Sequence, residues 1–62
     1  MDEISEFDRK NIGALVNGYG DWFTAQLVRL INKADMYNRE RIRAGFPETL
    51  AAYEAWERSD EG

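Results

Sequence analysis

The segment Asp21–Ala34 constrains the fold most, because it contains good helix formers and neither glycine nor proline. Five apolar residues recur in it at positions i, i+4, i+7, i+8 and i+11, which places them within an arc of roughly 100° on a helix. These residues are Phe23, Leu27, Leu30, Ile31 and Ala34. We therefore expect an amphipathic helix over residues 22–34, with Asp21 as its N-cap and the five apolar side chains facing the core.

Two further cap residues mark the starts of other helices. Ser5 can accept a backbone N–H from the first turn of a helix over residues 6–16. Residues 17–20, Asn-Gly-Tyr-Gly, favour the end of that helix, since asparagine and glycine tolerate the left-handed backbone conformation. Asp35 is the N-cap candidate of a short helix over residues 36–44.

The last helix is expected over residues 47–58. Pro47 suits its first position, where the N–H that proline lacks would be unpaired in any residue. Gly45, just before it, suits the left-handed end of the preceding helix. Three large side chains then recur every third position: Leu50, Tyr53 and Trp56. We interpret them as the core-facing side of this helix, because residues three apart share a helix face.

The fold class follows from a missing pattern, since no stretch alternates apolar and polar residues with a period of two. The chain has 62 residues, which suffice for one small core only. We therefore expect a single all-α domain over residues 1–62, a small bundle of three to four short helices. Without cysteine the bundle has no disulfide, so we also expect self-association into a homodimer or higher oligomer, with the helix face of Trp22, Gln26, Arg29 and Lys33 at or near the interface.

The composition excludes most catalytic chemistry. The chain contains no cysteine and no histidine, so it lacks a thiolate, the commonest general base and the commonest transition-metal ligand. The carboxylates do not converge in the expected arrangement as a general acid and base would. We expect no catalytic residue, no metal site and no cofactor, and therefore a protein that is not an enzyme.

Hydropathy argues for a protein of the cytoplasm. The longest nearly apolar stretch, residues 22–31, is interrupted by Thr24, Gln26 and Arg29 and is shorter than the ~20 apolar residues of a membrane span. The first residues, Met-Asp-Glu, are acidic, whereas a signal peptide begins with basic residues. We expect a soluble cytoplasmic protein without a membrane segment.

A second stripe follows the polar side of the longest expected helix. It consists of Trp22, Gln26, Arg29 and Lys33, again at i, i+4, i+7 and i+11. Tryptophan and arginine dominate protein interface hot spots, so these four residues are candidates for binding a partner protein. The alternative, given equal weight, is that Trp22 packs within its own chain, under the first helical segment or the Gly18–Gly20 turn.

Charge is segregated along the chain. Residues 1–8 and residues 44–62 are both acidic, whereas residues 29–43 carry an excess of positive charge within a chain of net charge −4. Arg39, Arg41 and Arg43 are candidates for binding an anion, together with Arg29 and Lys33 of the preceding helix, because guanidinium groups bind phosphates and carboxylates. The favoured alternative is that the acidic ends fold back onto this segment. The net negative charge disfavours nucleic acid as a partner.

The second half of the chain resembles a recurrent kind of short bacteriophage protein. The resemblance lies in three stretches: Leu27-Val28-Arg29-Leu30-Ile31-Asn32-Lys33-Ala34-Asp35 with Asn38, Arg39, Arg41 and Ile42, then Gly45-Phe46-Pro47-Glu48, then Ala52-Tyr53-Glu54-Ala55-Trp56. It spans roughly residues 21–56 and carries no catalytic or ligand-binding residue over to this chain. It implies an origin in a phage or prophage and action in the bacterial host cytoplasm.

Two hypotheses for function follow. The first is a noncatalytic interaction protein that binds a bacterial host protein and modulates or inhibits it, with a defence protein as one possible target. The second is an oligomeric sponge for a small anionic nucleotide signal of a bacterial defence system, held by the basic residues of the middle segment. For stability, the predicted core face implies that Leu27→Ala and Leu30→Ala would each cost about 2–5 kcal/mol.

Overall fold

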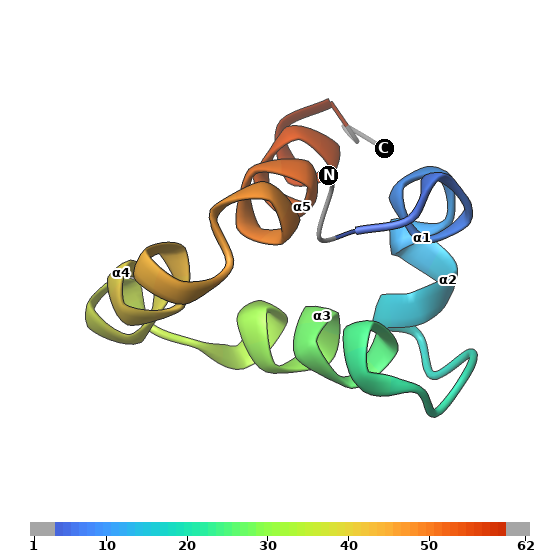
Figure 1. Cartoon of the computed structure of the whole chain (residues 1–62), viewed down its shortest axis with the longest axis horizontal. Coiled ribbons are helices and arrows are strands. Elements are labelled where there is room, and N and C mark those ends of the chain that lie inside the picture. Colours follow the sequence, from blue (N-terminus) through green and yellow to red (C-terminus); the bar gives the residue numbers. More distant parts are fainter. Residues whose placement is uncertain (1–3, 60–62) are drawn as a thin grey trace.

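A computed structural model describes residues 4–59, and these residues form five helices and no strand. The helices are α1 (Glu6–Lys10), α2 (Ile12–Val16), α3 (Phe23–Lys33), α4 (Met36–Gly45) and α5 (Pro47–Ser59), arranged in a ring around the core in Figure 1. The prediction of an all-α fold is confirmed. The predicted three to four helices become five, because the helix expected over residues 6–16 is divided into α1 and α2.

The division lies at Asn11, whose side chain competes for backbone hydrogen bonds. Its amide Nδ2 donates to the carbonyl of Phe7 at 2.7 Å, and its backbone leaves the helical region with φ −119° and ψ 31°. Asparagine in a helix favours such local bonds, which explains the break. The start of α1 is as predicted, since Ser5 Oγ accepts a hydrogen bond from the backbone N–H of Asp8 at 3.1 Å.

Two glycines turn the chain from α2 into α3. Gly18 and Gly20 have positive φ angles of 110° and 86°, as the Asn-Gly-Tyr-Gly sequence predicts. The N-cap of α3 differs from the prediction, because Trp22 and not Asp21 occupies that position, without a side-chain capping bond. Trp22 keeps an extended backbone with ψ 173° while its indole packs on the N-terminal helices, so α3 begins one residue later than expected.

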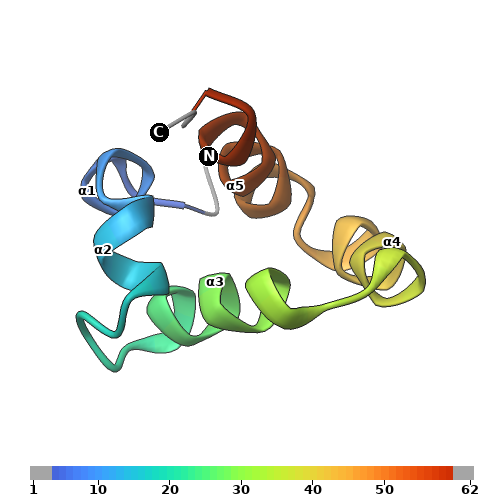
Figure 2. The ribbon, with the colours of Figure 1, turned by 180° about the vertical axis from the view of Figure 1, so that it is seen from behind.

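The core lies between α2, α3 and α5, with Ile4 closing it from the N-terminal side. Its fully or nearly buried members are Ile4, Ile12, Leu15, Ala25, Leu27, Val28, Ile31, Leu50, Ala52 and Tyr53. The predicted core-facing side of α5 is confirmed for Leu50 and Tyr53, and Trp56 packs against the cluster at its edge. Figure 2 shows α5 facing α3 across this core from behind.

The core face of α3 differs from the predicted one. Leu27 and Ile31 are buried as expected, but Phe23 is 65% and Leu30 is 55% exposed. The buried side is completed instead by Ala25 and Val28, so it is turned by roughly a quarter of a turn from the predicted stripe. Small and β-branched side chains allow α2 and α5 to approach α3 closely there, which decides which part of its apolar arc is covered.

The connection between α3 and α4 keeps these two helices apart. Ala34 and Asp35 both have extended backbones, with ψ 140° and 179°, and Asp35 caps α4 as predicted by accepting from the N–H of Asn38 at 2.8 Å. Helix α4 packs mainly on α5, and α3 and α4 diverge from their link in Figures 1 and 2. The prediction for Gly45 was wrong, because the helix continues through this residue without a positive φ.

Helix α5 starts at Pro47 as predicted and reaches back to the N-terminal helices. The indole of Trp56 lies over Gly13 of α2, where an added Cβ would be 3.3 Å from Trp56 Nε1. Glycine at this position therefore lets α5 approach α2. Within residues 4–59, no helix combines the length and apolar character that crossing a membrane requires.

Candidate functional site

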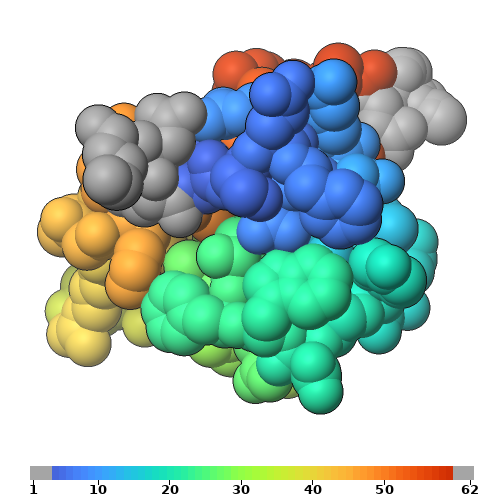
Figure 3. Space-filling view, turned by 45° about the vertical axis from the view of Figure 1, so that its right-hand side comes forward, coloured from blue at the N-terminus to red at the C-terminus, as the bar shows by residue number. Residues whose placement is uncertain are grey.

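The indole of Trp22, the first candidate for partner binding, packs against its own chain. Its Nε1 donates to Oδ1 of Asp8 in α1 at 3.1 Å, and its ring centroid lies 6.3 Å from that of Phe7 and 5.8 Å from that of Tyr19. Figure 3 shows the N-terminal helices lying directly on the start of α3 at this side of the molecule. Trp22 is still 39% exposed, and Phe7 and Tyr19 are more exposed than that, so the aromatic cluster is open to solvent.

Arg29 and Gln26 also bind backbone carbonyls of their own chain. The guanidinium of Arg29 donates from Nε to Leu15 at 2.8 Å, and from Nη2 to Tyr19 at 2.9 Å and to Gly20. These carbonyls belong to the end of α2 and to the turn, where helical partners are missing. Gln26 donates to the carbonyl of Asp21 at 2.7 Å. Three of the four residues of the predicted stripe therefore bind groups of their own chain: Trp22 binds α1, Gln26 the residue before α3, and Arg29 the end of α2 and the turn.

Two of the three candidate anion ligands form ion pairs between α4 and α5. Arg39 lies 3.1 Å from Glu57 and 3.8 Å from Glu54, and Arg43 lies 3.3 Å from Glu54. The hydrogen bond that Arg39 donates to Glu57 raises the pKa of Arg39, and the hydrogen bond that Arg43 donates to Glu40 raises the pKa of Arg43. Glu54 and Glu57 thus fold back onto the basic segment, as the favoured alternative predicted for the C-terminal end. The N-terminal acids have other partners, since Glu6 pairs with Lys10 and Asp8 accepts from Trp22. Residues 1–3 and 60–62 lie outside the described part of the chain.

Lys33 and Arg41 are different, because neither forms an ion pair with any of the residues that the structure describes. Arg41 lies over the ring of Tyr37, 4.6 Å from its centroid, and donates from Nη2 to the Tyr37 hydroxyl at 2.9 Å. Its guanidinium is therefore held in place while its charge is not neutralised by a carboxylate.

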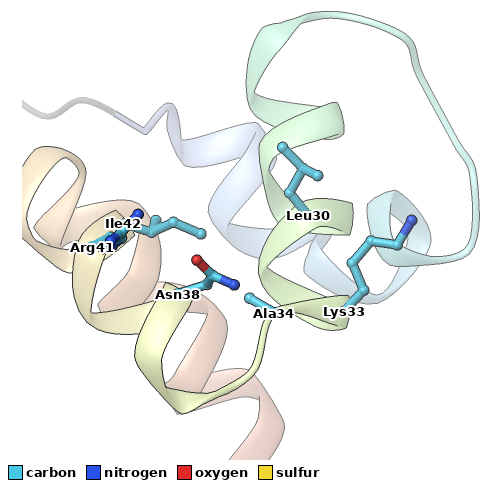
Figure 4. A pocket seen from close by; sticks show the side chains of 6 residues that line it. All are labelled: Leu30, Lys33, Ala34, Asn38, Arg41 and Ile42. Atoms are coloured by element: carbon cyan, nitrogen blue, oxygen red, sulfur yellow. The ribbon is translucent and has the colours of Figure 1, made fainter.

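These two cations border an open groove between α3 and α4, with a volume of about 370 Å³. Its lining consists of Leu30, Lys33 and Ala34 from the α3 side and Asn38, Arg41 and Ile42 from α4 (Figure 4). Leu30, Ala34 and Ile42 supply the apolar floor, the amide of Asn38 lies between Ile42 and Ala34, and Lys33 and Arg41 lie on opposite sides in this view. The groove exists because the extended Ala34-Asp35 link holds the two helices apart.

A pair of phenylalanines extends the same apolar surface. Phe23 lies on the same face of α3 as Leu30, two turns before it. The ring centroid of Phe23 is 5.5 Å from that of Phe46. Phe46 follows Ile42 by four residues at the end of α4 and packs against the core cluster. The surface from Phe23 and Phe46 along Leu30 and Ile42 is hereafter called the α3–α4 groove.

Several acidic side chains of the described residues have partners, and they do not form a metal-binding cluster. Within residues 4–59, no three acidic side chains are placed to hold a metal ion. The buried Asp8 carboxylate is hydrogen-bonded to Trp22, and Glu54 and Glu57 of α5 are paired with arginines. The α3–α4 groove is therefore the strongest candidate for a functional site.

No protein-family model, no curated protein and no solved structure matches this chain. Its function must be inferred from its own surface.

Sequence reasoning found the cations of the groove but not its floor. It assigned Leu30 and Ala34 to the core, and Ile42 to no stripe. One signal could have revealed the floor. The apolar arc of α3 includes Phe23, Leu30 and Val28, and this arc is wider than a single neighbouring helix covers. A single neighbouring helix therefore leaves part of the arc exposed.

Proposed function

We propose that this protein is a noncatalytic interaction protein that binds a segment of a bacterial host protein in the α3–α4 groove. The observation that carries the proposal is the open apolar floor of the groove, where Leu30 is 55% exposed beside Ala34 and Ile42. Apolar surface that is exposed contiguously and bordered by polar groups is typical of protein interaction sites.

The shape of the groove favours a protein segment over a small molecule. A volume of about 370 Å³ lies at the lower end of small-molecule pockets, and such pockets enclose most of their ligand. This groove is open along its length, so it suits a row of side chains presented by a larger partner. The resemblance to short phage proteins supports a host protein in the bacterial cytoplasm as that partner, and modulation or inhibition of it as the result of binding.

The alternative of a nucleotide sponge has less support. It needs several cations around one anion, but Arg39 and Arg43 are paired with carboxylates, and Arg29 is bound to backbone carbonyls. Lys33 and Arg41 point to opposite sides of the groove in Figure 4 and do not converge on one phosphate. A single chain therefore offers two separated cationic points and no phosphate pocket.

Self-association remains a proposal, and a second copy of the chain is the competing occupant of the groove. The sequence placed the dimer interface on the Trp22 face, but most polar groups of that face are bound within the chain. Sedimentation at micromolar concentration separates a 7.2 kDa species from a dimer. A dimer that Leu30→Glu dissociates would make the second copy the occupant.

The experiment that tests the proposed function compares three immobilised proteins in a bacterial lysate: the wild type, Leu30→Glu and Met36→Glu. Both variants place one negative charge at an exposed apolar position of the same region, but Met36 does not line the groove. We expect a protein retained by the wild type and by Met36→Glu and lost by Leu30→Glu, with the interaction reproduced by calorimetry on the purified partner. Equal retention by all three proteins, or by none, would contradict the proposal.

A further inference from the structure

Two cationic side chains, Lys33 and Arg41, line the α3–α4 groove. Lys10, Arg39 and Arg43 form ion pairs with glutamates, whereas Lys33 and Arg41 at the groove form none among the described residues. The chain as a whole has a net charge of −4. Asp35 in the link is the acidic residue beside them, and its carboxylate caps α4 at Asn38. Lys33 and Arg41 against Asp35 leave a local excess of positive charge at the groove, opposite in sign to the net charge of the chain.

The length of the groove matches a short helix. Along α3 the apolar row runs from Phe23 to Ala34, which corresponds to about 16 Å at the helical rise. An amphipathic helix presents apolar side chains at i, i+3 or i+4 and i+7, which span about 10 Å, so that three anchors fit on this floor. The opposite wall is α4, which packs mainly on α5, so the partner would fill the space between α3 and α4.

We propose that the occupant of the α3–α4 groove is an acidic amphipathic helix of the partner protein. Its apolar side would lie on Leu30, Ala34 and Ile42, and carboxylates on its two flanks would pair with Lys33 and Arg41. This inference rests on the proposed function and adds the chemistry of the partner to it. The two cations lie on opposite sides of the floor, which suits carboxylates on both flanks of one helix and not a single anion.

The test uses two synthetic 18-residue peptides with fluorescent labels and the same row of leucines. In one peptide the flanking positions are glutamate, and in the other they are lysine. Binding is measured by fluorescence anisotropy at about 0.15 M salt, where charges are screened beyond roughly 8 Å. Because the net charge of the protein attracts the lysine peptide, only local cations can reverse that preference. We expect the glutamate peptide to bind about tenfold more tightly.

Two variants assign the result to the groove. The double substitution Lys33→Glu/Arg41→Glu should reverse the preference between the peptides, and Leu30→Glu should weaken both. The matched control is Arg58→Glu, an exposed residue of the last turn of α5, which should leave the preference in favour of the glutamate peptide.

The outcomes separate this inference from the proposed function. If both peptides bind equally, or the lysine peptide binds more tightly, and Leu30→Glu weakens both, the acidic partner is overturned while the groove remains a binding site. If neither peptide binds, the acidic helix is overturned as occupant, and the lysate experiment decides the proposed function separately. If Leu30→Glu changes the binding of neither peptide, the groove is not the site and both proposals fail.

Discussion

The indole Nε1 of Trp22 donates a hydrogen bond to Oδ1 of Asp8 at 3.1 Å, across fourteen positions of the chain. Asp8 is only 6% exposed, so its carboxylate is shielded from water and requires polar partners. The bond connects α1 to the start of α3, and with it the N-terminal helices to the rest of the bundle.

We expect Trp22→Phe to lower the free energy of unfolding by about 1–2 kcal/mol, because the phenyl ring keeps the aromatic contacts and loses the N–H. The measurement is urea denaturation followed by circular dichroism. In an Asp8→Asn background the same substitution should cost less, since the charged acceptor is already absent. Equal costs in both backgrounds would show that the hydrogen bond adds nothing.

The two glycines of the turn should differ in their tolerance of alanine. At Gly18 an added Cβ meets no atom within 4 Å, so only the backbone penalty of a positive φ remains, about 1 kcal/mol. At Gly20 an added Cβ would lie 2.5 Å from the indole of Trp22. We therefore expect Gly20→Ala to cost at least about 2 kcal/mol, because it carries the same backbone penalty and also displaces the ring. Thermal unfolding of both variants compares them directly; equal melting temperatures would contradict the packing of Trp22.

The sequence predicted that alanine at Leu27 and at Leu30 would be equally costly, and the structure revises this prediction. Leu27 is buried, so Leu27→Ala should cost about 2–5 kcal/mol through the cavity that it leaves. Leu30 is exposed in the groove, so Leu30→Ala should cost about 0.5 kcal/mol or less. Chemical denaturation measures both costs. A Leu30→Ala variant as unstable as Leu27→Ala would place Leu30 in the core.

Tyr53 should make the stability of the protein fall at alkaline pH. Burial raises the pKa of its hydroxyl above the ordinary value of 10.0, and the nearby Glu57 carboxylate adds to this effect. The unfolded chain then releases the phenolic proton at lower pH than the folded protein does. The contribution of the protonated Tyr53 hydroxyl to the free energy of unfolding is therefore complete below about pH 10. It is lost as the pH rises through the pKa of Tyr53 in the folded protein.

The substitution Tyr53→Phe tests this dependence. It removes the hydrogen bond that the Tyr53 hydroxyl donates to Asn32 Oδ1 at 2.7 Å, so we expect about 1 kcal/mol less stability at neutral pH. Above pH 10 the loss of stability should be shallower than in the wild type. Urea denaturation between pH 8 and 11 measures both effects, and parallel curves for the two proteins would exclude Tyr53 as the source.

The sequence was sufficient where structure depends on neighbours within a few residues. Ser5 and Asp35 cap helices, Pro47 begins one, and Gly18 and Gly20 turn the chain, each through its own backbone conformation or a bond to a residue three positions away. The same local rules missed Asn11, whose side chain donates to the backbone carbonyl of Phe7 where the first helix breaks.

Tertiary structure decided the role of each face of α3. Phe23 and Leu30 belong to the apolar pattern of α3 whether or not another helix covers them, and in the structure both are exposed. The sequence pattern alone therefore does not show which part of a wide apolar arc a neighbouring helix covers. That choice depends on the carbonyls at the α2 end that Arg29 binds and on the extended Ala34-Asp35 link. The hydrogen bonds of Arg29 hold α2 against one side of α3, and the extended link holds α4 away from the other side of α3. The sequence determined the helices, and their packing left the α3–α4 groove open, because the two-residue link prevents α4 from covering it.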